Sequence, residues 1–358
     1  MAKIRKIKIL INTPNYKKPY LGGVANHYYG LRPYWNENVK YNIVGSRNGN
    51  NGNGKYLIFL DIIKFIWRIF FFKPNCIILN PSLAATALKR DLIFFKICII
   101  FKKKVIIFFH GFNPKNADRI NGNTFYLNFR RSDAFIVLSQ FAKKYLEKWG
   151  IKAPIYLSST KVDNRMLDNF DINSRQGSIK NILYLTRIEK TKGIFEALNI
   201  FKMLSNRYPS LKYTIVGSGS ALKESIRYSN ENNIPNISFT GMLTGNNLIS
   251  AYKSADLYLF TSHYEGMPTT VLEAMAFGLP IITSNVGGLK DFFINGKMGE
   301  MIDGFSPSDY VKSISKYISD CQLSKETSIY NHNYATQHFL ASNVAKSIEN
   351  ICYNIVKQ

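Results

Sequence analysis

The sequence predicts an α/β protein with two parallel sheets, and three features of the 358-residue chain lead to this prediction. Short apolar runs alternate with longer segments of helical periodicity. The alternation is interrupted by a polar segment at 164–180, interpreted as a linker, and then restarts. Charge divides near the same place, because residues 1–170 hold 29 Lys and Arg against 8 Asp and Glu, whereas residues 171–358 hold 18 against 15. We therefore expect two domains, 1–170 and 171–342, with different partners.

The first domain is expected to alternate strands and helices from its start. Each expected strand is a short run of apolar residues between turn-forming residues. Residues 45–55, rich in Gly and Asn, form a low-complexity loop. The expected strands are 6–11, 41–45, 76–80, 105–109, 133–138 and 155–157, and the expected helices are 24–32, 56–72, 83–100 and 140–149, the last with Ser139 as its N-cap.

The helix at 56–72 is very apolar, with Asp61, Lys64 and Arg68 at helical spacing on one face. Three charges in so short a segment make it a poor transmembrane span. Two alternatives stay open: the helix packs on the sheet, or it lies in a membrane surface. Packing on the sheet is the commoner outcome for a helix between two parallel strands.

The second domain repeats the alternation. Its strands again end at Gly-containing or charged connections. The expected strands are 181–186, 212–216, 237–240, 256–261, 281–283 and 298–302. One helix is expected between 193 and about 207, and a second directly after 217–219. Further helices are expected at 248–254, 271–276, 308–320 and 343–356.

Composition restricts the possible partners and the compartment. The net charge of +21 on residues 1–170 favours an anionic partner, such as phospholipid, a phosphorylated acceptor or nucleic acid. The four cysteines are scattered without metal spacing, and the start of the chain lacks the features of a secretory signal. A reducing cytosol is therefore the expected compartment.

Three strand ends of the second domain carry chemistry that fits one ligand. Arg187 and Lys192 follow one strand and suit a diphosphate. The Gly217-Ser218-Gly219 turn follows the next. Glu265 and Glu273 follow another and can accept hydrogen bonds from hydroxyl groups. Each alone has a purely structural interpretation, but parallel strands bring their carboxyl ends to one edge, where ligands bind.

The segment between the two glutamates predicts a loop and then a helix. Gly266 and Pro268 form a turn. Thr269 and Thr270 are candidate N-caps. The helix N-terminus that follows attracts anions.

The first domain offers two weaker signals. His110 ends a buried apolar strand, where it is either structural or part of a ligand site. Gly22 and Gly23 precede a helix, where they either let a phosphate approach the backbone or form a tight turn.

Four motifs resemble the C-terminal domain of family 4 glycosyltransferases. They are the R-x4-K-G pattern at 187–193, VGSGS at 216–220, TGML around Gly241, and HYEGMPTTVLEAMAFGLPIITSNVGG at 263–288. The most specific is the E-x7-E element from Glu265 to Glu273.

The resemblance is strong over 181–302 and looser over 1–160. It implies the GT-B fold, in which two Rossmann-like domains with parallel sheets face a central cleft. It also implies that the C-terminal helix at 343–358 packs back on the first domain.

The resemblance implies a role for each motif. Arg187 and Lys192 hold the donor diphosphate, Glu273 binds the ribose, and Gly217 and Gly241 border the nucleotide.

Glu265 contacts the transferred sugar, and Gly266, Met267 and Pro268 line the turn beside it. His110 lines the reaction centre.

Gly23 approaches the diphosphate from the first domain. The family's GGxxE segment is matched at 287–291 with Asp291 in place of Glu, which leaves its role open.

The implied function is a retaining glycosyltransferase of the hexosyltransferase type. Its donor is a UDP- or GDP-linked sugar, and its acceptor is a glycan or a polyprenyl-diphosphate-linked glycan. The family's habit, together with the basic first domain, points to bacterial surface polysaccharides such as lipopolysaccharide O-antigen or capsule. The enzyme is then cytoplasmic and peripheral on the inner face of an anionic membrane, without a nucleic-acid partner.

No cofactor and no metal are expected, because the chain has no D-x-D motif to bridge a metal ion to the diphosphate. Two alternatives stay open. One is a sugar-nucleotide epimerase of the same fold. The other is a membrane- or nucleic-acid-binding module with a degenerate sugar site.

Overall fold

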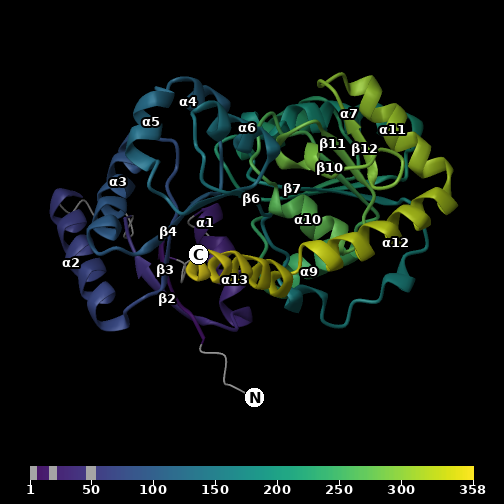
Figure 1. Ribbon diagram of the computed structural model, residues 1–358. Helices are drawn as coiled ribbons and strands as arrows, with labels where there is room; N and C mark the ends of the chain where they lie inside the picture. The colour runs from purple at the N-terminus through teal and green to yellow at the C-terminus, as the bar shows by residue number, and fades with distance from the viewer. Residues whose placement is uncertain (1–5, 16–21, 46–53) are drawn as a thin grey trace, which may run out of the picture. The chain divides into compact units, whose positions relative to one another are not determined.

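The computed structural model describes residues 6–15, 22–45 and 54–358 (Figure 1). The low-complexity loop expected at 45–55 therefore lies mostly outside the described residues. Within the described ranges, no helix combines the length and the apolar character that crossing a membrane requires.

The chain forms two compact α/β units. Unit 1 consists of Met1–Lys161 and Ala341–Gln358, and unit 2 consists of Val162–Leu340. The last helix thus belongs to unit 1, although it follows unit 2 in the sequence. Among the described residues, each unit holds one parallel six-stranded sheet, which confirms the expected α/β class.

The sheet of unit 1 has the strand order β2-β1-β3-β4-β5-β6. Its inner strands are apolar on both faces because helices cover both. Alternate residues such as Ile77 and Ile107 pack against α2, α3 and α5, whereas Phe108 faces α1 on the other side. The strands are β1 (Lys8–Thr13), β2 (Asn38–Ile43), β3 (Cys76–Leu79), β4 (Lys104–Phe109), β5 (Ala134–Val137) and β6 (Ile155–Leu157), and the helices are α1 (Gly23–Leu31), α2 (Gly54–Phe72), α3 (Ala85–Ile100), α4 (Pro114–Asp118), α5 (Gly122–Phe129), α6 (Gln140–Lys148) and α13 (Ala341–Lys357).

Helix α13 is fixed to unit 1 by a buried carboxylate. Oε1 of Glu349 accepts the backbone N–H groups of Asn36 at 2.6 Å and Glu37 at 2.8 Å. The helix also packs against α1, β3 and β4. These contacts explain why the chain's last segment completes the first unit.

The sheet of unit 2 has the strand order β12-β11-β10-β7-β8-β9. Helices α9, α10 and α12 cover one face, and α7 and α11 cover the other. The strands are β7 (Asn181–Leu185), β8 (Lys212–Val216), β9 (Ile237–Gly241), β10 (Leu257–Phe260), β11 (Ile281–Ser284) and β12 (Gly299–Ile302), and the helices are α7 (Ile194–Arg207), α8 (Leu222–Glu231), α9 (Gly245–Ser254), α10 (Thr269–Ala276), α11 (Pro307–Ser319) and α12 (Cys321–His338).

Strands follow the sequence pattern more closely than helices do. Every expected strand has a counterpart, although β2 begins earlier than expected. The N-cap role of Ser139 is confirmed by its side chain, which accepts the N–H of Ala142. Helices α4, α5 and α12 were not predicted from the sequence, because they lack a long apolar stripe. The buried face of α12 includes small polar residues: Ser324, Thr327, Ser328 and Asn331.

The segment at 164–180 is not a linker, which corrects the expectation from its polar sequence. Phe170 packs against Phe277 in the core of unit 2. The guanidinium of Arg175 is buried at the C-terminal ends of α9 and α10. It donates to the carbonyl oxygens of Tyr252, Lys253, Ala255 and Phe277.

Removal of this guanidinium should destabilise unit 2. Arg175→Ala leaves buried carbonyl groups without donors, so we expect a loss of about 3 kcal/mol or more in unfolding free energy. Urea denaturation followed by circular dichroism measures it. Arg227→Ala is the control, because that side chain is 71% exposed and its pair with Glu231 is a loose one at 3.8 Å. Equal stability of the two variants would contradict the capping role of Arg175.

Candidate active site

A shielded ion pair lies at the carboxyl edge of the sheet in unit 2. The chain runs outward from β7 through β8 to β9 and restarts at β10 on the other side of β7. Ligands of open parallel sheets bind at such a switch point. The connections after β7 and β10 carry Lys192 and Glu265, whose Nζ and Oε1 lie 2.6 Å apart. The side chains are only 12% and 17% exposed, so water screens the pair poorly.

The turn that carries Lys192 is held by direct contact between the two connections. The hydroxyl of Tyr184 donates to the carbonyl of Lys192 at 2.6 Å. Gly193 has φ +74°, and a Cβ there would lie 1.9 Å from the carbonyl oxygen of Thr261. Only glycine allows this approach, and it brings Lys192 close to the loop after β10.

Glu265 is positioned by its own loop and by the next one. The hydroxyl of Ser262 donates to the same Oε1 atom at 3.1 Å. The carbonyl of Gly266 accepts the N–H of Gly288, at 2.7 Å, from the connection after β11. A Cβ on Gly287 would lie 2.4 Å from that carbonyl oxygen. The glycine pair of the sequence motif therefore locks the turn beside Glu265.

Glu273 has different surroundings from Glu265. It lies in the middle of α10, is 7% exposed, and its Oε2 accepts the hydroxyl of Tyr252 at 2.8 Å. Burial first, and then the Glu273 carboxylate, raise the pKa of Tyr252. The tyrosine thus stays protonated and holds one carboxylate oxygen in place.

The start of α10 corrects the expectation that Thr269 or Thr270 caps it. The N-cap is Pro268, and no described side chain makes a capping hydrogen bond. Thr270 Oγ1 accepts the hydroxyl of Tyr258 at 2.8 Å instead. Met267 packs partly against the core of unit 2 and so fixes the turn. The first N–H groups of α10 have no side-chain cap among the described residues.

Three further expected residues of unit 2 follow strands of the same sheet. Arg187 follows β7 but is 70% exposed and pairs with Glu189 at 3.1 Å. Gly217 has φ +141°, and a Cβ there would lie 1.9 Å from the carbonyl of Thr186, so this glycine brings two connections together. Gly241 has φ +71° and open space around it.

His110 belongs to a network of neutral polar groups at the carboxyl edge of unit 1. The side-chain N–H of Asn80 donates to the carbonyl of Asn12 at 2.8 Å, which fixes the orientation of its amide. Asn80 Oδ1 accepts the hydroxyl of Tyr28 at 2.8 Å and lies 2.9 Å from Nε2 of His110. Because this oxygen only accepts, Nε2 carries the proton and Nδ1 of His110 is an acceptor.

A second histidine lies beside the first. His27 is 2% exposed, and its ring centroid is 4.8 Å from that of His110. Burial lowers the pKa of His110 to about 3. Burial, then His110 and then Lys161, lower the pKa of His27, so both rings are neutral near pH 7. Among the described residues, no group of three or more His, Cys, Asp or Glu side chains is placed to hold a metal ion.

The sequence interpretation missed part of this network. Gly23 begins α1 and is exposed, and a Cβ at this position would have no atom within 4 Å. His27 lies one helical turn after it, and Asn12 and Asn80 are polar residues at the ends of apolar strands. His110 was identified from its position at a strand end, and the same signal would have identified Asn12 and Asn80.

A family match covers the part of the chain that holds the ion pair. Residues 168–334 match the model of the family described as glycosyl transferases group 1. The matched residues lie within unit 2 and include Lys192, Glu265 and Glu273. This part of unit 2 is therefore similar to the group 1 glycosyl transferases.

Curated relatives are similar to this chain over part of their length. Glycogen synthase from Mycobacterium tuberculosis (strain CDC 1551 / Oshkosh) is 34% identical over 119 residues, which cover 33% of this chain and 29% of the relative. The capsular polysaccharide biosynthesis glycosyltransferase CapM from Staphylococcus aureus is 27% identical over 191 residues, which cover 50% of this chain and 48% of the relative. The chain thus spans less than half the length of each.

Solved structures resemble nearly the whole chain, beyond the residues that match the family model. Sucrose-phosphate synthase from Thermosynechococcus elongatus has a TM-score of 0.76 at 15% identity, and the match covers 98% of this chain and 100% of the synthase chain. Anabaena Alr3699/HepE in complex with UDP has a TM-score of 0.75 at 16% identity and covers 97% and 100%. These likenesses show the fold, and they confirm the expected GT-B class.

The buried histidines should make the stability of unit 1 depend on pH. Unfolded histidine has a pKa of about 6.5, so below that value the unfolded chain binds protons that the folded chain excludes. The contribution of these groups is complete above about pH 6.5 and is lost as the pH falls toward the folded pKa of His110, about 3. Well below pH 6.5, His110 alone then costs about 1.4 kcal/mol per pH unit.

Replacement of His110 tests this dependence. His110→Asn keeps a polar group beside Asn80 and removes one titrating ring, so stability should fall less steeply between about pH 6.5 and about pH 5. Urea denaturation at several pH values measures the slope. An unchanged slope would show that His110 does not titrate on unfolding.

Proposed function

We propose that the chain is a retaining glycosyltransferase of the hexosyltransferase type. It would move a sugar from a nucleoside-diphosphate donor to a glycan acceptor without a metal ion. One observation carries the proposal: the shielded ion pair of Lys192 and Glu265 at the switch point of a group 1 glycosyl transferase domain. A cation and a carboxylate at that place are complementary to a diphosphate and to sugar hydroxyls.

Unit 2 is proposed to bind the donor. Lys192 has three N–H donors, of which Glu265 accepts one at 2.6 Å and the carbonyl of Tyr264 one at 3.4 Å. The third can donate to a phosphate oxygen. The exposed guanidinium of Arg187, on the same connection, can add a bidentate contact. Open space around Gly241 suits a nucleotide close to the backbone.

The nucleotide is proposed to be UDP or GDP. Anabaena HepE has been solved with UDP and with UDP-glucose, and the pneumococcal O-GlcNAc transferase GtfA with UDP and GlcNAc. These complexes support UDP as the first nucleotide to test. Glu273 would accept hydrogen bonds from the ribose while Tyr252 holds its Oε2 atom.

The proposed reaction needs no enzymic nucleophile. The bond between the sugar's anomeric carbon and the diphosphate oxygen breaks, and the acceptor oxygen bonds to that carbon on the same face. The acceptor proton passes to the leaving phosphate oxygen. Lys192 stabilises the leaving charge, and Glu265 orients the sugar beside the Gly266 turn. Unit 1 would supply His110, whose neutral Nδ1 can accept a hydrogen bond.

The acceptor is proposed to be a glycan on a polyprenyl-diphosphate carrier in bacterial surface polysaccharide synthesis. The relative CapM is a capsular polysaccharide biosynthesis glycosyltransferase. The net charge of +21 on residues 1–170 would attract the chain to an anionic membrane surface. The enzyme would then work as a peripheral protein on the cytoplasmic face.

Variants of the ion pair test the proposal. A thermal-shift screen with nucleoside diphosphates and their sugars first identifies the donor, since a ligand that binds the folded state stabilises it. Lys192→Ala and Glu265→Gln should each lower sugar transfer by about 100-fold or more, because each removes a group that meets the diphosphate or the sugar.

A neighbouring lysine provides the matched control. Lys190 lies in the same turn as Lys192 but is 67% exposed and pairs with Glu224. Lys190→Ala should keep transfer within about twofold of the unchanged chain, since exposed pairs contribute little. Transfer that survives Lys192→Ala and Glu265→Gln would refute this placement of the site.

The metal-free, retaining mechanism predicts two further results. Excess EDTA should leave the transfer rate unchanged, because cationic side chains neutralise the leaving group. NMR of the first-formed product should show the anomeric configuration of the donor. Loss of activity that Mg²⁺ or Mn²⁺ restores would refute metal independence, and an inverted linkage would refute the retaining mechanism.

A further inference from the structure

Helix α2 exposes a broad apolar face. Its buried side, which includes Phe65 and Ile69, packs on the sheet of unit 1. The opposite side consists of large apolar residues that are about half exposed or more. This α2 face is made of Phe59 (57%), Ile63 (48%), Trp67 (60%), Phe70 (58%) and Phe71 (69%).

The expectation that Asp61, Lys64 and Arg68 share one face of α2 is wrong. Asp61 does not share an exposed face with Lys64, because it is 2% exposed and accepts the N–H of Gly45 at 3.1 Å. Helix α2 is therefore apolar on two sides, and its only carboxylate is hidden. A helix of this kind is expected inside a protein core or in contact with lipid.

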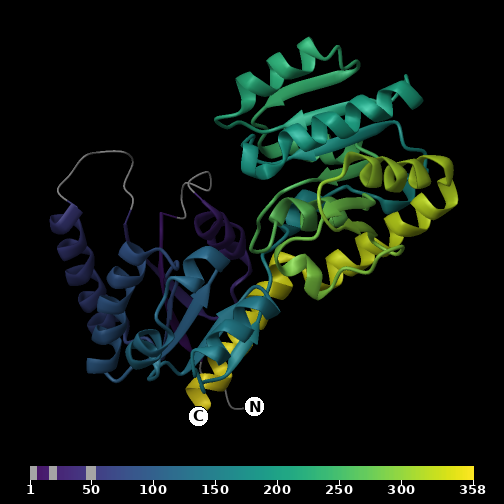
Figure 2. The same cartoon turned by 90° about the horizontal axis from the view of Figure 1, so that it is seen from above.

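The α2 face continues onto the neighbouring helix. Helices α2 and α3 lie side by side, and Phe70 packs edge-on against Phe101, with ring centroids 5.2 Å apart (Figures 1 and 2). On α3, Ile93 is 42% exposed and Ile100 is 74% exposed. The exposed apolar surface thus extends from α2 onto α3.

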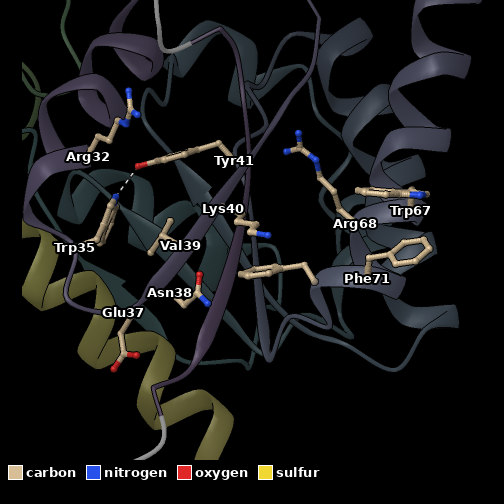
Figure 3. A pocket seen from close by; sticks show the side chains of 11 residues that line it. Arg32, Trp35, Glu37, Asn38, Val39, Lys40, Tyr41, Trp67, Arg68 and Phe71 are labelled. Carbon is tan, nitrogen blue, oxygen red and sulfur yellow. Dashed lines mark hydrogen bonds between the residues drawn. The ribbon is translucent and has the colours of Figure 1, made fainter.

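A basic groove borders this patch. Its cavity, of about 630 Å³, lies between α2 and the edge strand β2 (Figure 3). Arg32, Lys40 and Arg68 line it, and Trp67 and Phe71 lie side by side at its α2 wall, with ring centroids 4.5 Å apart.

The groove has a different lining from the His110 network, although its Tyr41 packs against Tyr28 of that network. Of its three cations, Arg32 follows α1, Lys40 lies within β2, and Arg68 lies near the end of α2. The network instead gathers where β3 and β4 end. Nothing in the proposed transfer reaction uses the groove.

The charge around the patch identifies its occupant. The groove contains three cations and one lining carboxylate, Glu37. Exposed Lys64 and Lys73 flank the α2 face. An isologous contact with a second copy would place these like charges against each other, which is costly. Apolar side chains ringed by Lys and Arg are instead complementary to an anionic bilayer surface.

We propose that the α2 face docks the chain on an anionic phospholipid bilayer. Its aromatic side chains enter the boundary between headgroups and acyl chains, and the cations of the groove hold lipid phosphates. This inference deepens the proposed function and rests on it for its purpose, because it names the surface that would bring the enzyme to a lipid-linked acceptor. The helix lies in the surface and does not cross it.

Vesicle co-sedimentation tests the docking surface. The full chain should sediment with vesicles of phosphatidylcholine and phosphatidylglycerol in equal parts, and less so as salt rises. Trp67→Ser combined with Phe71→Ser should lower the partition coefficient by about tenfold or more, because it removes two exposed apolar anchors. Lys40→Gln and Lys64→Gln should each lower it by about fivefold.

A matched variant in the same unit is the control. Leu127 on α5 is 63% exposed and lies outside the α2 face, so Leu127→Ser should bind vesicles like the unchanged chain. Circular dichroism should show that every variant is folded. Absence of binding to anionic vesicles would overturn the proposal, and so would binding that Trp67→Ser/Phe71→Ser leaves intact.

Two further measurements separate the possible outcomes. Analytical ultracentrifugation should find the chain monomeric, whereas a dimer that Trp67→Ser/Phe71→Ser dissociates would show that a second copy covers the face. The thermal shift caused by a nucleoside diphosphate should be the same in that variant. If a nucleoside diphosphate causes no thermal shift in the unchanged chain, the donor site is refuted. The docking surface is then judged by the vesicle result alone.

Discussion

The ion pair between Lys192 and Glu265 is the interaction on which the candidate site of unit 2 depends. It joins connections that are 73 residues apart in the sequence and follow neighbouring strands. Gly193 lets the two backbones touch, and Ser262 shares the carboxylate. Because the pair is largely shielded, removal of either charge leaves the other without compensation. The positions of the Lys192 ammonium and the Glu265 carboxylate, which a ligand would meet, are thus fixed by their attraction to each other.

The two units use the same kind of sheet for different chemistry. The carboxyl edge of unit 2 carries an ion pair, Lys192 and Glu265, whereas the hydrogen-bonding groups His27, His110 and Asn80 of unit 1 are neutral, with the Lys161 cation near His27. A charged edge suits a diphosphate, and a neutral hydrogen-bonding edge suits hydroxyl groups. This contrast supports the proposal that unit 2 binds the donor.

The sequence pattern was sufficient to find the strands along the chain but not the contacts between distant residues. Apolar runs predict the inner strands, since buried parallel strands must be apolar on both faces. The pattern fails for α12, whose buried side is rich in small polar residues, and for Arg175, whose burial depends on carbonyl groups far away in the sequence. Motifs locate Lys192 and Glu265, but their direct contact, the Tyr252 bond of Glu273 and the burial of Asp61 follow only from tertiary packing.

Hydrogen–deuterium exchange with a nucleoside diphosphate tests the central claim most directly, because it locates the ligand without any substitution. UDP is the first ligand to use, followed by GDP. The account predicts slower exchange of backbone amides at 186–193 and 264–272, the connections after β7 and β10, when the ligand is bound. Protection confined to other segments, with these two unchanged under saturating ligand, would contradict it.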